Sequence, residues 1–420
     1  MNSNLSKQID TITINAKKAA LILQSVKQSD VDKVLHTMAK LLSSESDLLK
    51  KENEKDLNRA RENGLSSAMI DRLTISDKVI TSMIKGLKEV SQLTNSVGIR
   101  YDERTRPNGL KICKMKVPIG VIGIIYESRP NVTIDAAAIC LKSQNAVILR
   151  GGSEAYHSNI FLNSLFSKAL KEADLPENSI QMIPSTDRSA VELLLKKDEY
   201  VDLIIPRGGE SLIKMVVENS RIPVIKHYKG VCHIYVSAKA DIEKSLPIII
   251  NAKVQRPGVC NTIETLLIDS ELPLANRKSI INALIEKNVS LFGDAETCML
   301  SSEIKLATEE DWKAEYLDLK LAVKTVNGLQ EAIDHINTYS SHHTDSILTE
   351  SKQEAFSFLQ KVDSASVMVN VSTRFADGGE YGMGCEIGIS TDKLHARGPM
   401  GVEDLTTYKW IVEGDGQIRI

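Results

Sequence analysis

Pro118-Ile-Gly-Val-Ile-Gly-Ile-Ile-Tyr126 is an unbroken apolar run, and Ala146-Val-Ile-Leu-Arg-Gly-Gly-Ser153 is a second one that ends in a glycine turn. Unbroken apolar runs are typical of strands in parallel sheets, which are covered on both faces. The alanine-rich segment 132–142 between them predicts a connecting helix. The alternation continues, with strands expected at 180–183, 201–205 and 222–226 and helices at 156–173, 188–197 and 210–219. This series predicts a doubly wound α/β domain of the nucleotide-binding type.

The chain before Pro107 is expected to be mostly helical. Apolar residues recur at three- and four-residue steps over 31–42 and again over 74–93, the stripe of an amphipathic helix. Ser29-Asp30 is expected to cap the first of these helices. A densely charged segment over 48–63 predicts a further helix.

A β-hairpin is expected next, from strands at 99–101 and 110–117 around the turn 106–109. Such an exposed edge needs a partner, such as another subunit. Beyond residue 260 the α/β pattern repeats on a smaller scale before a strand-like tail at 405–412. The strands expected there are 262–268, 322–326, 345–348 and 366–371, and the helices are 274–287, 328–337 and 351–360.

Composition excludes several classes of function. The 420 residues carry 52 Lys and Arg against 55 Asp and Glu, so the net charge of −3 gives no case for binding nucleic acid or an anionic membrane. Aromatic residues make up only 4%, fewer than a base-stacking surface normally needs. No signal peptide is visible, the apolar runs are too short to span a bilayer, and none of the 6 cysteines stands in a CxxC motif. These features predict a cytoplasmic protein with reduced thiols.

Two strand-end glycine pairs point to a cofactor. Arg150-Gly-Gly-Ser153 and Pro206-Arg-Gly-Gly209 each follow an apolar strand and precede a helix, where backbone N–H groups and the helix dipole favour anions. One such pair could equally be a simple turn, but two in one sheet favour a cofactor crevice. The candidate contacts are Arg150, Gly151, Gly152, Ser153, Pro206, Arg207, Gly208 and Gly209.

Cys260 is the candidate nucleophile, because it follows a Pro-Gly turn and precedes a strand, which places it on a loop. Arg256 supplies a nearby positive charge that favours a thiolate. The alternative, a small buried hydrophobe, fits the other cysteines better, with Cys385 a distant second candidate. A metal site at His342-His343-Thr-Asp345 is not expected, because adjacent histidines on an extended segment point in opposite directions. That segment is interpreted as a polar active-site or surface loop.

These motifs together resemble the aldehyde dehydrogenase superfamily. Within it the sequence is similar to the branch that reduces L-glutamyl 5-phosphate with NADPH to L-glutamate 5-semialdehyde, the second step of proline biosynthesis from glutamate. The stretches that carry the resemblance are Met69-Ile-Asp-Arg-Leu73, Tyr126-Glu-Ser-Arg-Pro-Asn131, Val147 to Glu154, Ile205 to Gly209, Gln255 to Asn261, Ala332 to Asp345 and Val369 to Phe375. The alternatives are an acylating dehydrogenase for another substrate, such as a CoA thioester, and a catalytically silent homologue.

The resemblance implies an aldehyde-dehydrogenase-like fold with a Rossmann-type domain, a smaller α/β domain and an oligomerisation arm. We expect a nucleotide-binding domain from 1–98 and 118–228, a domain carrying the catalytic cysteine from 229–402, and an arm from 99–117 and 403–420. It also implies a homo-oligomer, and a glutamate kinase is a candidate partner. Oligomeric state beyond that is left open.

The resemblance further implies roles for single residues. Cys260 would attack the acyl phosphate, and Asn131 with the Cys260 backbone N–H would stabilise the oxyanion. Glu315 corresponds to the carboxylate that holds the nicotinamide ribose. Hydrolytic relatives carry a water-activating glutamate where this chain has His227-Tyr-Lys-Gly230, which suits an enzyme that must not hydrolyse its thioester. His227 is either a weaker base or a structural residue.

Cofactor preference and substrate binding rest on arginines. Arg150 with the neutral Ser153 favours NADP(H) over NAD(H), although the neighbouring Glu154 weakens that argument. The substrate carboxylate is assigned to Arg374, with Arg129, Arg256 and His343 as competitors. For each arginine the alternative is an ion pair with a neighbouring acid.

Overall fold

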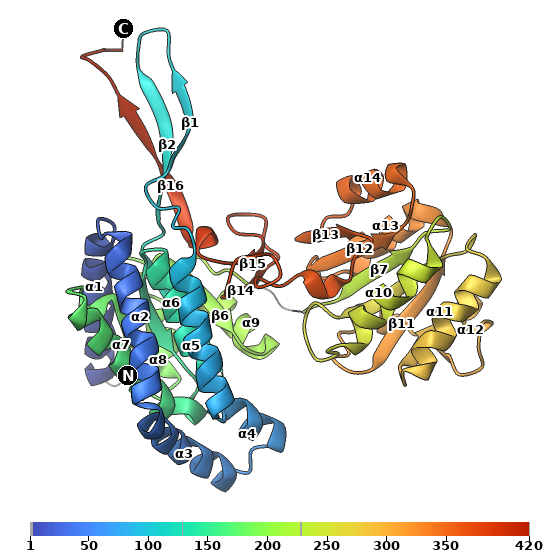
Figure 1. Ribbon diagram of the computed structural model, residues 1–420, viewed down its shortest axis with the longest axis horizontal. Helices are drawn as coiled ribbons and strands as arrows, with labels where there is room; N and C mark the ends of the chain where they lie inside the picture. The colour runs from blue at the N-terminus through green and yellow to red at the C-terminus, as the bar shows by residue number, and fades with distance from the viewer. Residues whose placement is uncertain (1–2, 128, 227–228, 420) are drawn as a thin grey trace. The chain divides into compact units, whose positions relative to one another are not determined.

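The computed structural model describes residues 3–127, 129–226 and 229–419 (Figure 1). The chain divides into two compact units. The first comprises Met1–Lys226, Gly382–Gly388 and Met400–Ile420, and the second comprises His227–Tyr381 and Ile389–Pro399. The sequence predicts one continuous domain around the cysteine, 229–402. In the structure, 382–388 and 400–402 cluster with the first unit instead.

A four-stranded parallel sheet forms the centre of the first unit, in the order β5-β4-β3-β6. Its strands are β3 (Val121–Tyr126), β4 (Ala146–Arg150), β5 (Ile180–Met182) and β6 (Leu203–Arg207). Every residue of β3 is buried, as the unbroken apolar run predicts. Successive residues of a strand point to opposite faces, so the burial of all of β3 means that both faces of the sheet are covered, with α1 and α6 contacting β3 and β4. The doubly wound prediction is therefore confirmed.

Nine α-helices accompany this sheet in the described residues. The helix expected over 31–42 starts earlier than its expected Ser29-Asp30 cap, because its regular turns already include Gln28. The short helix at 67–73 was not predicted; Ser66 caps it by accepting a hydrogen bond from the Met69 N–H. The helices are α1 (Ser3–Leu23), α2 (Gln28–Ser44), α3 (Ser46–Glu62), α4 (Ser67–Leu73), α5 (Asp77–Gln92), α6 (Asn131–Lys142), α7 (Tyr156–Glu172), α8 (Ser189–Leu194) and α9 (Glu210–Asn219).

The strand expected at 222–226 is wrong. That segment makes only an isolated bridge between Ile204 and Val224. β6 consequently forms the edge of the four-stranded sheet.

A three-stranded antiparallel sheet extends from the first unit as an arm (Figure 1). It joins β1 (Arg100–Thr105), β2 (Lys111–Pro118) and β16 (Thr406–Glu413), with β2 in the centre. The expected hairpin and strand-like tail therefore pair with each other. All of β1 is exposed, and Tyr408, Trp410 and Val412 of β16 are exposed as well.

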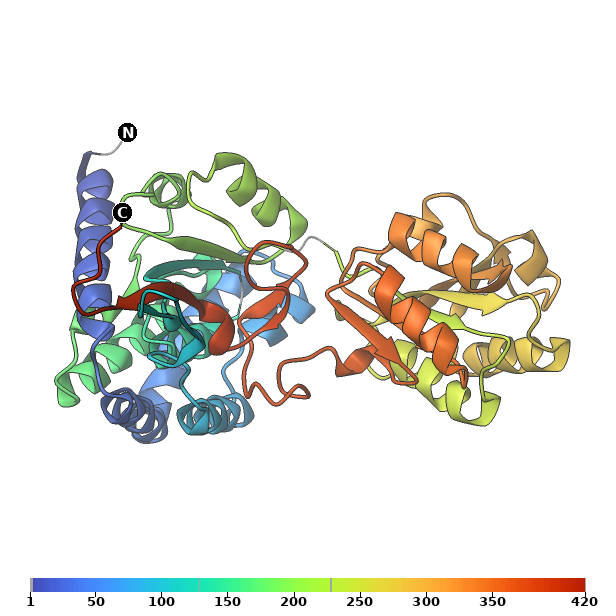
Figure 2. The same ribbon diagram turned by 90° about the horizontal axis from the view of Figure 1, so that it is seen from above.

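A seven-stranded parallel sheet forms the second unit, in the order β10-β9-β11-β8-β7-β12-β13. This unit spans fewer residues than the first, as expected, although its sheet has three more strands. Figure 2 shows it between two layers of helices. α10 and α11 contribute to the hydrophobic core on one face, and α13 and α14 contribute to a second core.

β7 and α10 were not predicted, because a buried histidine interrupts the strand and Pro247 lies inside the helix. The strands are β7 (Cys232–Val236), β8 (Ile263–Asp269), β9 (Ser290–Gly293), β10 (Lys305–Leu306), β11 (Lys320–Val326), β12 (Thr344–Leu348) and β13 (Ser366–Val369). The helices are α10 (Ile242–Val254), α11 (Leu274–Glu286), α12 (Ala295–Cys298), α13 (Gly328–Tyr339) and α14 (Lys352–Lys361). β14 (Gly388–Ser390) and β15 (Gly398–Met400) form a separate two-stranded sheet.

No helix in the described part of the chain is both long enough and apolar enough to cross a bilayer.

Candidate active site

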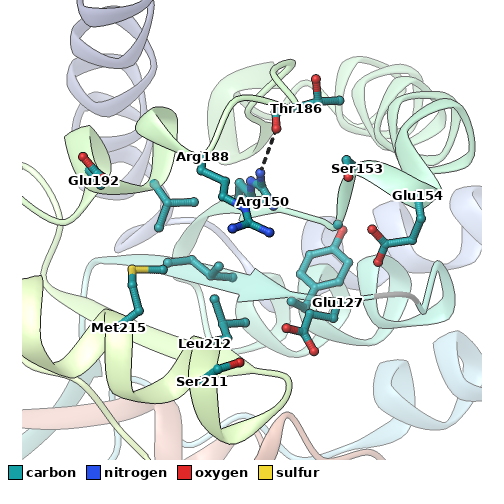
Figure 3. A pocket seen from close by; sticks show the side chains of 14 residues that line it. Glu127, Arg150, Ser153, Glu154, Thr186, Arg188, Glu192, Ser211, Leu212 and Met215 are labelled. Atoms are coloured by element: carbon teal, nitrogen blue, oxygen red, sulfur yellow. Dashed lines mark hydrogen bonds between the residues drawn. The ribbon is translucent and has the colours of Figure 1, made fainter. Parts of the chain in front are cut away.

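A cavity of about 450 Å³ lies in the first unit, beside the carboxyl ends of β3 and β4 (Figure 3). This volume is within the range of small-molecule sites, and the end of a parallel sheet is where doubly wound folds bind ligands. Its apolar wall comes from α8 and α9, and its polar groups come from the strand-end loops. The residues used below are Arg150, Ser153, Glu154, Arg188, Leu212 and Met215.

Arg150 ends β4 and points into this cavity (Figure 3). One of its terminal nitrogens donates to the Thr186 carbonyl at 3.3 Å, and its Nε is buried with no hydrogen-bond partner. Burial lowers the pKa of Arg150, Glu154 opposes that shift, and the positive charge of Arg188 adds to it. A guanidinium with an unsatisfied buried N–H fits a site that accepts an anion.

The glycines at these strand ends lie close to neighbouring side chains. A side chain at Gly151 would collide with the buried Asn159, so this position favours glycine. At Gly152 the nearest atoms belong to the carboxylate of Glu154, and at Gly208 they belong to Glu127 and Leu212. These are the ends of flexible side chains, which can move, so the crowding there is weaker evidence for glycine.

The backbone N–H groups expected to remain available at these turns are partly taken. Asp56 of α3 is buried and accepts hydrogen bonds from the N–H groups of His157 and Ser158, at the start of α7. Glu127 accepts from the Gly209 N–H at 2.9 Å. Much of the anion-binding capacity of this cavity therefore comes from its arginines rather than from helix N-termini.

The second glycine turn adjoins the cavity without lining it: Ser211 and Leu212, just after the turn, are lining residues, whereas Pro206 and Arg207 are not. The Arg207 side chain instead packs against Gly388 and lowers the pKa of Asp135 by its charge. Burial dominates at Asp135 and raises the pKa of that carboxyl to about 6. Asn131, the first residue of α6, donates its side-chain amide to Asp135 at 3.3 Å.

Cys260 lies in the second unit, on the loop between α10 and β8, and is half-buried. The Cys232 thiol donates to the Cys260 carbonyl at 3.2 Å, and a side chain at Gly230 would collide with the Cys260 backbone. Thr262 closes the loop by donating its hydroxyl to the Arg256 carbonyl at 2.7 Å. Cys260, the candidate nucleophile, therefore stands on a tightly supported backbone. All six cysteines are free thiols.

Arg374 is tied to the residue that follows Cys260. Its guanidinium donates to the side-chain oxygen of Asn261, and its Nε donates to Gln255 Oε1 at 2.8 Å. Both acceptors are neutral amides, so the arginine keeps its charge for another partner. Arg256, on the same loop, is exposed and lowers the pKa of Arg374 through repulsion, second to burial.

Glu315 lies beside this loop, where its carboxylate accepts from the Gly230 N–H at 2.8 Å. The turn that carries Glu315 is anchored by Glu264, which accepts from the Leu317 N–H at 3.1 Å. Glu264 also pairs with Lys253 at 2.5 Å, and neither side chain of the pair is exposed. Residues before and after Cys260 are thus connected to the Glu315 turn.

His343 is fully buried, which excludes the surface-loop alternative for its segment and leaves the active-site loop. Its Nδ1 is 2.8 Å from the Thr344 hydroxyl and 3.8 Å from the Cys232 thiol, so it stands behind the nucleophile loop. His227 lies outside the described residues. Within the described ranges, no three His, Cys, Asp or Glu side chains are placed to hold a metal ion.

Sequence reasoning missed Arg188 and the Lys253–Glu264 pair. Arg188 follows the strand expected at 180–183, so the strand-end rule that selected Arg150 could have found it. Lys253 and Glu264 carry no such signal, because a local pattern does not show that two charged residues are buried together.

Comparison with known proteins agrees with this arrangement. Residues 2–296 match the aldehyde dehydrogenase family. The chain is 55% identical over 388 residues to a gamma-glutamyl phosphate reductase from Desulfatibacillum aliphaticivorans, covering 92% of this chain and 93% of that one. It is 51% identical over 415 residues to that from Desulfotalea psychrophila, covering 99% of both. The crystal structure of gamma-glutamyl phosphate reductase from Thermotoga maritima matches with a TM-score of 0.96 at 42% identity, over 98% of this chain and 100% of that one. The chain therefore belongs to the aldehyde dehydrogenase family and, within it, to the gamma-glutamyl phosphate reductases.

Proposed function

We propose that this chain reduces L-glutamyl 5-phosphate to L-glutamate 5-semialdehyde with NADPH and releases phosphate, the second step of proline biosynthesis from glutamate. The observation that carries the proposal is the placement of Cys260 on a supported loop beside two arginines, in a chain similar to gamma-glutamyl phosphate reductases over 99% of its length. An acyl phosphate is a highly charged substrate, and guanidinium groups suit its anionic ends.

Cys260 is assigned as the nucleophile. Its thiolate attacks the carbon of the acyl phosphate, the C–O bond to phosphate breaks, and a thioester forms. Hydride addition to the thioester then gives a thiohemiacetal, which releases the semialdehyde and returns the thiolate. Forming the thioester in this way replaces one difficult step by two easier ones.

Asn131 and the Cys260 backbone N–H are assigned to the oxyanion that develops at the substrate carbonyl. The Asn131 amide carries two N–H donors. One of them is directed to Asp135 in this structure, which orients the group and leaves the second for the oxyanion.

Arg374 is assigned to the substrate α-carboxylate, and Arg256 is placed to assist it. No carboxylate of the described residues lies within ion-pair distance of Arg374, so its ion-pair alternative lacks a partner there. His343 is a further candidate for substrate binding. Because it is buried, we assign it a supporting role behind Cys232 and not direct contact with substrate.

The cavity of the first unit fits a nicotinamide dinucleotide. Its support is the pair of crowded glycines, the unsatisfied Arg150 Nε and the apolar wall that suits an adenine ring. We assign Arg150, Gly152 and Ser153 to the adenosine end and Glu315 to the nicotinamide ribose. NADPH, when bound, supplies the hydride. The positive charge of Arg150 and the neutral Ser153 favour NADPH over NADH.

The cellular setting follows from the same proposal. Six free cysteines suit the reducing cytoplasm. The edge strands of the arm suit assembly into a dimer or larger homo-oligomer. A glutamate kinase that makes the labile acyl phosphate is the proposed partner.

Purified protein tests the proposal in the reverse direction. With glutamate semialdehyde and NADP⁺, NADPH formation should require inorganic phosphate, and CoA should not replace it. Turnover that depends on CoA, or that is as fast without either acceptor, would contradict the assignment.

A further inference from the structure

Two arginines from different loops meet in the cavity of the first unit (Figure 3). Arg150 ends β4, and Arg188 stands immediately before α8. Arg188 is exposed, whereas Arg150 is partly buried. Their charges oppose each other, since Arg188 lowers the pKa of Arg150.

Neither guanidinium forms an ion pair in the described part of the chain, although the nearby charges of Glu154 and Asp187 favour the charged form of Arg150. In the described part of the chain no carboxylate lies within 4.0 Å of either group, and the one hydrogen bond that Arg150 makes through its side chain goes to a backbone carbonyl. Two neighbouring cations that share no anion repel each other. Such a pair is suited to a doubly charged group placed between them, because two planar forks match the oxygens of a phosphate monoester.

We propose that Arg188 and Arg150 together bind the 2′-phosphate of the adenosine ribose, the group that distinguishes NADP from NAD. This inference rests on the proposed function, because it takes the cavity as the dinucleotide site. Arg188 is then the specificity-determining residue that the sequence motifs did not include.

The surroundings of the pair favour this ligand over a free anion. Val191, Leu212 and Met215 provide an apolar wall in the same cavity, which suits the flat face of a base. Ser153 provides a neutral hydroxyl beside Arg150. Glu154 and Glu192 also line the cavity and would repel an anion. A second arginine would offset this negative charge.

The test measures binding without substrate, so it does not depend on catalysis. Dissociation constants of NADPH, NADH, 2′,5′-ADP and 5′-AMP are measured by calorimetry for the wild type, R188Q and R188K. R221Q is the matched control, since Arg221 is an exposed arginine of the same unit that does not line the cavity. Because Arg188 is exposed, its substitution should leave the melting temperature unchanged.

We expect R188Q to weaken NADPH and 2′,5′-ADP roughly 10- to 100-fold while changing NADH and 5′-AMP less than about twofold. R188K should lie between R188Q and the wild type, because lysine keeps the charge but loses the fork. An equal loss for all four ligands, or no loss for any, would overturn the assignment of Arg188 and leave the proposed function intact. A wild-type protein that binds 5′-AMP as tightly as 2′,5′-ADP would overturn both this inference and the proposed preference for NADPH.

Discussion

Lys253 Nζ lies 2.5 Å from Glu264 Oε2, and both side chains are fully buried. The lysine lies in the last turn of α10 and also donates to the Ile263 carbonyl at 3.0 Å. Burial lowers the pKa of Lys253 and raises that of Glu264 to about 7, and the attraction between the two groups opposes both shifts. The pair encloses the loop of Cys260, which connects the two residues.

Removing one partner should therefore be costly. K253M leaves a buried carboxylate without its cation and should lower the free energy of unfolding by about 3–5 kcal/mol. The double variant K253M/E264Q should recover most of that loss, because no unpaired charge remains and the amide oxygen can still accept from Leu317.

Urea unfolding measures both effects. The control is K85M, which breaks the exposed pair of Lys85 and Glu89 and should cost less than about 1 kcal/mol. A K253M variant as stable as K85M would show that the buried pair contributes nothing to folding.

Asp135 should give the first unit a pH-dependent stability. Burial raises the pKa of this carboxyl from 3.8 to about 6, with Asn131 and Arg207 opposing the shift and Cys385 close by. Between these two pH values the folded protein binds the proton that the unfolded chain has lost, so stability falls as pH rises from about 4 to about 6. D135N should lack this decline. Parallel stability curves for the two proteins across that range would contradict the expected pKa.

Substitutions of Arg256 and Arg374 should distinguish an arginine that only binds substrate from one that also holds Asn261 in place. R256Q should raise the KM for semialdehyde about tenfold and leave kcat within about threefold, because its side chain is exposed and makes no hydrogen bond or ion pair with the residues that the structure describes. R374Q should raise KM and also lower kcat, because Asn261 beside the nucleophile loses its tether. Steady-state kinetics with R221Q as control decides this, and identical effects of the two substitutions would contradict the distinction.

The arm should control assembly. Trp410 and Tyr408 are exposed on its edge strand, where their rings meet edge to face and Lys114 lies within 5.1 Å of the Trp410 ring centre. The double variant Y408E/W410E should dissociate the homo-oligomer to monomers, because it places two carboxylates on that surface. Sedimentation velocity measures the change; a wild-type monomer, or an unchanged oligomer in the variant, would count against the proposed arm function.

Local patterns predicted the first unit well and the second less well. β3 and β4 are unbroken apolar runs, and the structure buries them as such runs predict. Arg150 could be selected as a site residue because it stands at the end of β4. The pattern failed at β7, where a fully buried His233 interrupts the run, and at α10, which contains Pro247. The polar neighbours of His343 left open whether its loop lies at the surface or in an active site, and only the structure shows that packing buries it. Residues such as Arg188 and Glu264 acquire their roles from contacts that only the fold creates.

The central claim is that Cys260 carries the acyl group and that phosphate removes it. Rapid mixing of the enzyme with glutamate semialdehyde and NADP⁺, without phosphate, measures this most directly. We predict a burst of about one NADPH per active site and then little turnover, with the acyl group found on Cys260 by mass spectrometry and released by added phosphate. The variant C260A should show no burst. A burst in C260A, or steady turnover of the wild type without phosphate, would contradict the account.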